Sequence, residues 1–593
     1  MVPVWVLRSQ APSAILDITD ISLTSKKSMQ DYVIRGRVIG QGCNSLRIEA
    51  WDKDLIWDDP VGLSTTDAQG KFFIRFDRFT FWDLFLERKP DLYFKLFRTD
   101  TLIHNTENSV LWNVSRPDID VCIEMASTEV PITQPPTDQG GKPQMVSHGT
   151  LPLRSGYGPY SPFDESGKFG RIFPYLKPFE ASDEWLTKVA ELMDDETLDD
   201  PTRDSQSVAA GFTFLGQFID HDITFDPTSS LEKQNDPTAT RNFRTPLLEL
   251  DNLYGSGPES NPYLYNQDQD GKFLLGEGGI DLPRNSQKVA LIGDPRNDEN
   301  KIVSQLQLAF LKFHNAVIDH PEVQAYPKGQ RFEKAQEIVR WHYQWIVLHE
   351  YLPLTVSQEL VDDILKNGLK VFKWKVEPFI PVEFSVAAFR LGHSQVRNRY
   401  RVNETLEAKL FELSFFNQQR GISEKEKVDW RFFFDLDAHC PPQASRKLDQ
   451  KLANILKDLP APIVGPGDQR RSLALRNLLR GKSFGLPSGQ SVACAMGIPP
   501  LPNEKLGLAG IEVSGEAPVE APLWYYILKE AELYSGGETL GPVGGRLVAE
   551  VLIGLLVGDF KSYLTLDPCW KPFLGNREGE FTMADLLRVA GVA

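Results

Sequence analysis

The chain has 593 residues, of which 41% are hydrophobic and 11% aromatic, and its formal net charge is −17. That length exceeds one ordinary hydrophobic core, so two or more domains are expected. The apolar content excludes a disordered chain. The negative charge argues against a nucleic-acid-binding surface and against docking on an anionic membrane.

The cysteines and the apolar segments indicate which metal sites, disulfides and membrane segments to expect. The five cysteines are widely spaced and form no CxxC pair or Cys/His cluster, so neither a zinc site nor a disulfide framework is expected. The segment MVPVWVLRSQ has no basic region before its apolar run, which predicts a cytoplasmic protein or one exported by a non-classical route. The apolar run at 547–557 is too short for a bilayer and carries Glu550, so we expect a buried core helix and no transmembrane segment.

Residues 1–130 are expected to form a small β-sandwich. DYVIRGRVIG, SLRIEAWD, KFFIRFD and PDLYFKLF alternate or are rich in β-branched and aromatic residues, and turn sequences such as DAQGK separate them. The loop WDKDLIWDDPVG gathers acids that could bind calcium, although a solvated loop tip is the simpler interpretation. These acids are Asp52, Asp54, Asp58 and Asp59.

The rest of the chain reads as an arm followed by helices. Residues 131–173 are rich in Pro, Gly and Ser, which predicts a linker or an arm wrapped over the next domain. Residues 174–593 are predicted to form one large, mainly α-helical domain. Helical spacing of apolar residues is seen in ENKIVSQLQLAFLKFHNAVI, RFEKAQEIVRWHYQWIVLHEYL, LDQKLANILKDL and LGPVGGRLVAEVLIGLLVGDF.

The segment GQFIDHDITFDP, residues 216–227, concentrates polar groups within an apolar helix pattern. If the helix continues to His221, then Gln217, Asp220 and His221 share one face at i, i+3 and i+4. Asp222 is rotated by about 100° and faces a different neighbour. A helix that ends in solvated acids is the competing interpretation, but the apolar flanks indicate that these groups are buried and need partners.

Three further segments carry weaker signals. In IGDPRNDEN, Arg296 and Glu299 lie at i and i+3 near a helix start, and the segment alone favours a helix-capping role for Asp298 and Glu299. His393 in AAFRLGHSQVRNRY follows apolar residues, a setting in which a histidine is more often a core residue than a ligand. Asn477 in SLALRNLLRGK could accept a hydrogen bond from an imidazole and so select its tautomer.

The segment RTPLLELDNLYGS places side-chain oxygens at alternating positions, on Thr245, Glu249 and Asp251, with the carbonyl of Leu247 among them. Hard cations such as calcium take six to eight oxygen ligands, including main-chain carbonyls. A polar loop between helices explains the same residues equally well.

In combination and in this order, these motifs resemble the animal-type haem peroxidases of the peroxidase–cyclooxygenase superfamily, over roughly residues 200–565. The resemblance implies a haem b cofactor, with His221 as the distal base, Gln217 orienting small ligands and Arg296 stabilising charge on peroxide. It implies His393 as the iron ligand, with Asn477 accepting from its other nitrogen.

The resemblance also assigns residues at the haem edge and a metal site. Arg390 would lie near the haem edge, and Asp220 and Glu299 match carboxylates that can become esterified to haem methyl groups. Calcium would be bound by the following set: Asp222, Thr245, Leu247 through its carbonyl, Glu249 and Asp251.

Several departures from the family pattern stand out. Glu249 and Asp251 replace an aspartate and a serine that animal members commonly use, and Asn300 excludes the sulfonium link of one mammalian branch. The few cysteines cannot reproduce the animal disulfides. Together with an N-terminal domain that resembles transthyretin-like or carboxypeptidase-regulatory sandwiches, this predicts a bacterial member.

The expected activity is reduction of hydrogen peroxide coupled to oxidation of halides, thiocyanate or small aromatic donors such as phenols. A haem-dependent fatty-acid oxygenase is the first alternative, although Arg390 occupies the position of that branch's radical tyrosine, and neither Tyr343 nor Tyr400 replaces it. A calcium-binding or adhesion protein with an inactive peroxidase domain is the second alternative.

Overall fold

The computed structural model describes six short ranges of the N-terminal region and most of the remainder of the chain. Described are residues 32–39, 45–52, 59–76, 92–98, 101–105, 118–124 and 169–593, the last without 198, 226–241, 243, 375–376, 415–419, 465–468 and 514–517. Contacts divide the chain into two compact units, one within residues 1–145 and one comprising most of residues 146–593.

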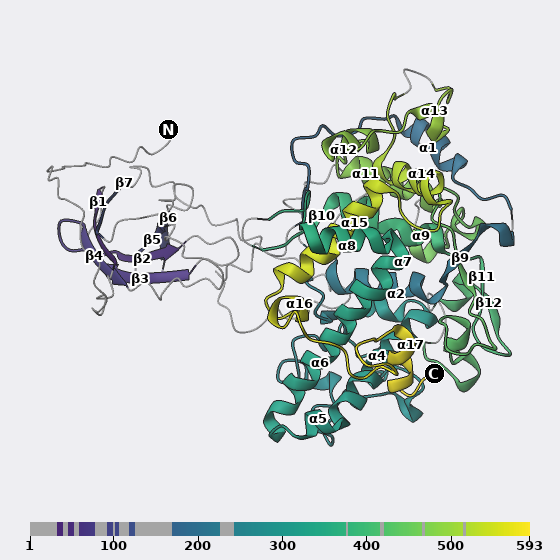
Figure 1. Cartoon of the computed structure of the whole chain (residues 1–593), viewed down its shortest axis with the longest axis horizontal. Helices are drawn as coiled ribbons and strands as arrows, with labels where there is room; N and C mark the ends of the chain where they lie inside the picture. Colours follow the sequence, from purple (N-terminus) through teal and green to yellow (C-terminus); the bar gives the residue numbers. More distant parts are fainter. Residues whose placement is uncertain are drawn as a thin grey trace, which may run out of the picture. The chain divides into compact units, whose positions relative to one another are not determined.

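The N-terminal unit contains two β-sheets whose buried side chains form one core (Figure 1). In the first, β1 pairs antiparallel with β4 and parallel with β7, and the second is antiparallel in the order β3-β2-β5-β6. Both sheets supply alternate residues to the core, for example Ile34 and Ile74 from one sheet and Ile48 and Phe94 from the other. The strands are β1 (Tyr32–Ile39), β2 (Arg47–Asp52), β3 (Asp59–Thr65), β4 (Lys71–Phe76), β5 (Leu92–Arg98), β6 (Thr101–Asn105) and β7 (Asp118–Glu124).

The predicted strands β1, β2, β4 and β5 are confirmed, because their alternation matches one buried face. The acidic loop is shorter than predicted. Asp52 ends β2, Asp59 begins β3, and the two are register partners in the antiparallel pair. Asp54 and Asp58 lie outside the described residues.

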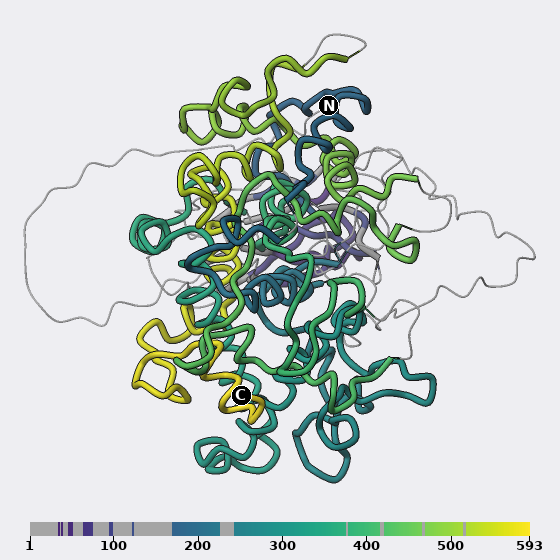
Figure 2. The backbone as a smooth tube through the Cα atoms, turned by 90° about the vertical axis from the view of Figure 1, so that its right-hand side faces the viewer, coloured from purple at the N-terminus to yellow at the C-terminus, as the bar shows by residue number. Residues whose placement is uncertain are grey.

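The second unit is mainly helical, and its fold class is as predicted (Figures 1 and 2). Its longer helices are α1 (Asp183–Leu192), α2 (Gly211–Ile223), α4 (Lys301–Asp319), α6 (Arg331–Ile346), α8 (Gln358–Asn367), α11 (Leu473–Ser483), α14 (Leu523–Ser535) and α15 (Pro542–Gly558). Shorter ones are α3 (Asp251–Tyr254), α5 (Pro321–Gln324), α7 (Leu352–Val356), α9 (Gly392–Gln395), α10 (Ala461–Val464), α12 (Gly489–Ala495), α13 (Asn503–Leu506), α16 (Tyr563–Leu566) and α17 (Met583–Val589). Two-stranded pairs join β8 (Phe169–Gly170) to β10 (Ile380–Pro381), β9 (Asp204–Ala209) to β13 (Ala444–Arg446), and β11 (Arg399–Arg401) to β12 (Glu407–Lys409).

The apolar periodicities of α4 and α15 predicted these helices correctly. In α15 every residue from Leu547 to Leu556 is buried, so this most apolar run is a core helix. Within the described ranges, none of the helices combines the length and the apolar composition that a bilayer span requires. The C-terminal helix α17 packs on α4, which brings the chain end back to the middle of the sequence (Figure 2).

One helix prediction was wrong, and one helix is interrupted. Residues 448–459 form only a short 3₁₀ turn, Asn454–Leu456, because Leu448 and Leu452 donate their main-chain N–H groups to Gly537 and Met193 instead of to their own turn. The predicted helix from residue 331 to 352 contains a π-helical turn, η8 (Val347–Tyr351), before α7. A second π-helical turn, η9 (Glu383–Ala387), precedes the 3₁₀ helix η10 (Ala388–Leu391).

The end of the predicted arm is fixed to the helical unit. The fully buried carboxylate of Glu383 accepts the N–H groups of Ile172 and Phe173, each at 3.1 Å. Residues 131–168 of that arm lie outside the described residues.

Candidate active site

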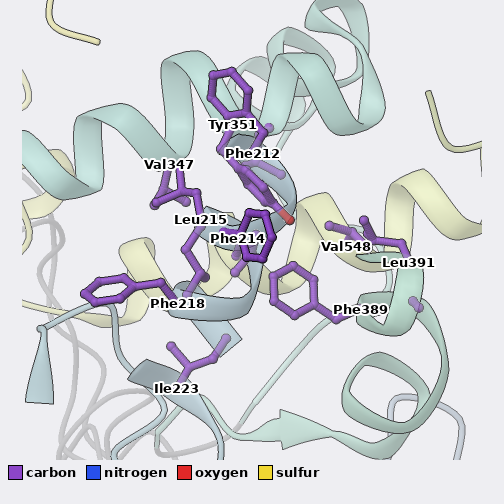
Figure 3. Close-up of a cluster of buried hydrophobic side chains, with 14 of the residues drawn as sticks. Phe212, Phe214, Leu215, Phe218, Ile223, Val347, Tyr351, Phe389, Leu391 and Val548 are labelled. Atoms are coloured by element: carbon purple, nitrogen blue, oxygen red, sulfur yellow. The ribbon is translucent and has the colours of Figure 1, made fainter. Parts of the chain in front are cut away.

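Helix α2 is oriented by its apolar face. Leu215, Phe218 and Ile219 are fully buried, and Phe218 stacks on Phe310 of α4 at 4.5 Å between ring centroids (Figure 3). Side chains of η8, η10 and α15 complete this core, as seen at Tyr351, Phe389 and Val548 (Figure 3). This packing determines where the polar residues of α2 point.

The polar residues of α2 differ in burial, and the division is not the one that their spacing predicted, because His221 is buried together with Asp222. Gln217 and Asp220 keep accessible surface, whereas His221 and Asp222 are buried. The ring Nδ1 of His221 lies 2.6 Å from Oδ1 of Asn297. Burial, and after it the charge of Arg296, lowers the pKa of His221 to about 3, so this imidazole is neutral at neutral pH.

Arg296 lies beside His221 and is held by several acceptors. Its Nε and Nη2 donate to Asp294 at 3.1 and 2.8 Å, and Nη2 also donates to the carbonyls of His221 at 3.1 Å and Thr224 at 2.6 Å. Asp294 is fully buried and also binds Arg244, at 2.5 Å. Burial would raise the pKa of Asp294, but the two guanidiniums hold it below its usual range.

The predicted capping role of the acids after Arg296 was wrong. Asp294 caps the 3₁₀ helix η6 (Pro295–Asp298), and Asn300 caps α4 by accepting the N–H of Ile302 at 2.9 Å. Asp298 instead forms an ion pair with Arg284. Asp294 and Asn297 were not predicted as site residues from the sequence, although both lie within two residues of Arg296.

Asp220 and Glu299 interact electrostatically with Arg296. Burial lowers the pKa of Arg296, but Asp294, Asp220 and Glu299 together raise it above its usual value. Burial also raises the pKa of both carboxyls, although Asp220 is only half-buried and Glu299 is exposed by surface area. A raised pKa and an accessible side chain are compatible if each carboxyl is surrounded by protein on most sides and open to solvent on one.

His393 is the second histidine of this region. It lies in α9, which contacts α2. It is half-buried, and burial, followed by the charge of Arg390, lowers its pKa to about 3. The rings of Trp524 and His393 are arranged edge to face, with their centroids 6.4 Å apart. Burial raises the pKa of Asp220, and the charge of Arg390 is among the groups that partly oppose this rise, so a charge near α9 acts on α2.

Asn477 contacts His393 as predicted, but through its other amide atom. Nδ2 of Asn477 lies 2.8 Å from Nδ1 of His393, whereas Oδ1 accepts from Nη1 of Arg390 at 2.7 Å. A guanidinium can only donate, so Arg390 takes the amide oxygen and the nitrogen faces the ring. The predicted acceptor role of Asn477 therefore needs a rotation of its amide.

The residues predicted to bind calcium lie close together, and one buried oxygen among them has no partner. Oδ2 of Asp222 accepts the N–H of Leu250 at 3.1 Å, while its buried Oδ1 makes no hydrogen bond by geometry. The buried hydroxyl of Tyr343 also makes none, and burial and then Asp222 raise the pKa of this tyrosine. Thr245 donates to Asp251 at 3.2 Å. Burial, and then the charges of Asp251 and Glu249, raise the pKa of Asp222 well above its usual value.

The fit to a cation is nevertheless incomplete. Arg340 contacts Glu249 in two ways. Nη2 of Arg340 lies 3.7 Å from Oε2 of Glu249, and Nε of Arg340 donates to the main-chain carbonyl of Glu249. No metal-binding group of three or more His, Cys, Asp or Glu side chains is present in the part of the chain that the structure describes. The orphaned oxygen and the clustered acids fit a cation, while the side chain of Glu249 has a competing partner.

The fold is similar to that of solved peroxidase structures. Peroxidase A from Dictyostelium discoideum superimposes on 67% of this chain and 88% of its own, with a TM-score of 0.50 and 16% identity, which shows a shared fold. The fatty acid alpha-dioxygenase of Oryza sativa aligns over 72% of this chain with a TM-score of 0.49.

Sequence comparisons show a similarity to one protein family. The family model described as animal haem peroxidase matches residues 230–506, a range that contains Arg296, Glu299, His393 and Asn477 but not α2. Over this range the chain is similar to the animal haem peroxidases.

Individual relatives are distant. Dual oxidase of Drosophila melanogaster is 23% identical over 322 residues, which are 51% of this chain and 19% of that protein. Heme peroxidase 2 of Caenorhabditis elegans is 27% identical over 249 residues, 31% of this chain and 34% of that protein. The chain thus spans about a fifth to a third of the length of these curated relatives.

Proposed function

We propose that the protein is a haem peroxidase that reduces hydrogen peroxide and oxidises halides, thiocyanate or small phenols. The observation that carries the proposal is a buried, neutral His221 whose main-chain carbonyl accepts a hydrogen bond from Arg296, on a helix that contacts α9, which contains His393. A neutral base beside a fixed positive charge is suited to proton transfer from a weakly acidic peroxide.

The haem would be held by His393, with Arg390 at its edge and Asp220 and Glu299 beside it. When bound, haem supplies the redox chemistry by which peroxide is reduced. His221 would accept a proton from the peroxide at Nε2 and return it to the departing oxygen. Gln217, on the accessible side of α2, would orient the small ligand.

Arg296 would act mainly through its charge. Its Nε and Nη2 are engaged by Asp294 and by main-chain carbonyls, and no hydrogen bond of Nη1 is present among the described residues. Nη1 therefore retains donors for a developing negative charge, while the other contacts prevent the guanidinium from moving.

Two finer assignments belong to the same proposal. Asp220 and Glu299 would be able to form ester bonds with haem methyl groups under peroxide. Mass spectrometry of denatured protein tests this, and haem that is fully extractable after peroxide treatment would exclude it. Calcium would be bound by Asp222, Thr245, the Leu247 carbonyl, Glu249 and Asp251, and would tie the end of α2 to the segment before α3.

The decisive experiment is an absorption spectrum of haem-loaded protein before and after one equivalent of hydrogen peroxide. We expect a spectral change that His221→Ala slows by about 10²–10⁴-fold and that His349→Gln, which alters a histidine on the exposed side of η8, leaves intact. Loss of haem binding in His393→Ala would support the ligand assignment. Rapid oxygen uptake with linoleate and no peroxide would instead support a fatty-acid oxygenase.

A further inference from the structure

A chain of buried amides extends from His221 away from the candidate active site. Asn297 accepts from the ring Nδ1 at 2.6 Å and donates through Nδ2 to Oε1 of Gln307 at 2.8 Å. Gln307 donates through Nε2 to the main-chain carbonyl of Asn252 at 3.2 Å. The side chains of Asn297, Gln307 and Asn252 are all fully buried, so water does not satisfy them.

The far end of this chain has a fixed polarity. A main-chain carbonyl can only accept, so Gln307 must present its nitrogen to Asn252 and its oxygen to Asn297. Asn297 must then present its nitrogen to Gln307 and its oxygen to His221. An amide oxygen also only accepts, so the ring hydrogen of His221 resides on Nδ1 and Nε2 keeps a free lone pair.

The carbonyl of Asn252 is itself immobilised. A Cβ at Gly293 would lie 2.6 Å from this carbonyl oxygen, so the main chain of residue 293 packs directly against it. The side chain of Asn252 donates to the carbonyl of Phe218 at 3.2 Å, on the turn of α2 that precedes His221. The anchor therefore moves with α2 rather than independently of it.

We propose that Asn297 and Gln307 are positioning residues that lock His221 in the tautomer with Nε2 unprotonated. They contact neither substrate nor cofactor, and they act through His221. The proposal rests on the proposed function only for its catalytic consequence, because the tautomer is a property of the protein itself.

The test begins with the tautomer. Full-length protein with ¹⁵N-labelled histidine is examined by two-bond ¹H–¹⁵N correlation, in which Nε2 is recognised because it couples to both carbon-bound ring hydrogens. The signal of His221, one of nine histidines, is assigned by its loss in His221→Gln. We expect Nε2 of His221 to appear as an unprotonated nitrogen, and an Nε2–H signal would overturn the proposal.

Three variants and one control test the relay itself. Asn297→Leu removes the acceptor and Gln307→Met frees the Asn297 amide to rotate, so both should mix the two tautomers. Asn297→Asp keeps an acceptor at Nδ1 and should retain the single tautomer. The control is Gln305→Met, which removes another buried amide of the same helix. In the wild type, Nε2 of Gln305 donates to the carbonyl of Ile280 at 2.8 Å, outside the relay.

The catalytic consequence is measured as the rate of the reaction with hydrogen peroxide. Asn297→Leu should slow this reaction about 10-fold, which is less than the 10²–10⁴-fold loss expected when the base is removed. Asn297→Asp and Gln305→Met should leave the rate unchanged. A single, unchanged tautomer in Asn297→Leu and Gln307→Met, or mixing in Gln305→Met as well, would overturn the relay. An unchanged rate in His221→Gln would overturn the proposed function and leave the tautomer result standing.

Discussion

The hydroxyl of Tyr351 lies against the main chain of Gly216, one residue before Gln217. A Cβ at this glycine would come within 2.6 Å of Oη of Tyr351, closer than side-chain contacts allow. The π-helical turn η8 ends at Tyr351, so this irregular turn and the site helix α2 approach each other at a point where no methyl group fits. The position of α2 therefore depends on the absence of a side chain at Gly216.

Gly216→Ala should move α2 and lower stability, in spite of the better helix propensity of alanine. Overpacking costs about 1–3 kcal/mol, against a gain of about 1 kcal/mol from propensity. We expect a net loss measured by urea unfolding, together with weaker haem retention. The double variant Gly216→Ala with Tyr351→Phe should recover most of the lost stability. Gly481→Ala in α11, whose nearest contact would be an ordinary 3.5 Å, should not destabilise.

The reaction with peroxide should tolerate acid unusually well. Because burial lowers the pKa of His221 to about 3, the base remains unprotonated from neutral pH down to about 4. Stopped-flow rates should stay flat over that interval and fall only near pH 3. A decline centred near the ordinary value of 6.5 would show that the site is more hydrated than its burial indicates.

Asp222 offers a test of calcium binding with two opposite outcomes. If a cation neutralises Asp222, Glu249 and Asp251, then Asp222→Asn should lower calcium affinity at least 10-fold, and chelation should destabilise the wild type but not the variant. Without a cation, the raised pKa of Asp222 reflects burial first and then repulsion by Asp251 and Glu249. In that case Asp222→Asn would raise the unfolding free energy, and titration calorimetry would detect no calcium.

Stability should also depend on pH through His342. Its Nδ1 lies 2.7 Å from the carbonyl of Ile338, its Nε2 has no partner, and aromatic rings including Phe581 and Trp570 surround it. Burial lowers its pKa to about 4, so between pH 6.5 and 4 the unfolded chain binds a proton that the native chain does not.

The contribution of His342 is therefore fully present above pH 6.5 and is lost as the pH falls toward 4, by about 3 kcal/mol in total. His342→Phe should reduce the slope of unfolding free energy against pH in this window. Equal slopes for wild type and variant in urea titrations at pH 7.5, 6 and 5 would contradict the assignment.

The amide of Asn477 should control the electronic character of haem bound at His393. Asn477→Asp supplies oxygens to both Arg390 and the ring Nδ1, so it should make His393 a stronger donor and lower the haem reduction potential. Asn477→Leu should raise the potential or weaken haem binding. Equal potentials in all three proteins, measured by spectroelectrochemistry, would show that the amide does not act on the ligand.

Sequence patterns predicted what depends on side-chain periodicity. The alternation of Leu46, Ile48 and Ala50 and the helical stripe of α4 identified their elements, because burial on one face constrains the residues in between. The same rule failed for residues 448–459, whose leucines Leu452 and Leu456 are buried although the backbone bonds to other segments.

At the site, residue types and spacings were predictable, but hydrogen-bond direction was not. Asn477 faces His393 with nitrogen because Arg390 competes for the oxygen, and no local pattern reports a competitor 87 residues away. Asn297 went unnoticed because an asparagine beside an arginine carries no periodic signal. Its importance arises from a partner 76 residues earlier in the chain.

The two π-helical turns, Val347–Tyr351 and Glu383–Ala387, impose a constraint on how this chain can change over evolution. Each wide turn holds one residue more than an α-turn, and each ends at or shortly before a residue of the site region, Tyr351 in one case and Arg390 in the other. Deleting one residue would either close the wide turn or rotate the residues after it by about 100° about the helix axis, and either change would alter the site region. Side chains at these turns can therefore be exchanged, whereas their length cannot, and descendants of this sequence should differ there by substitution and not by gaps.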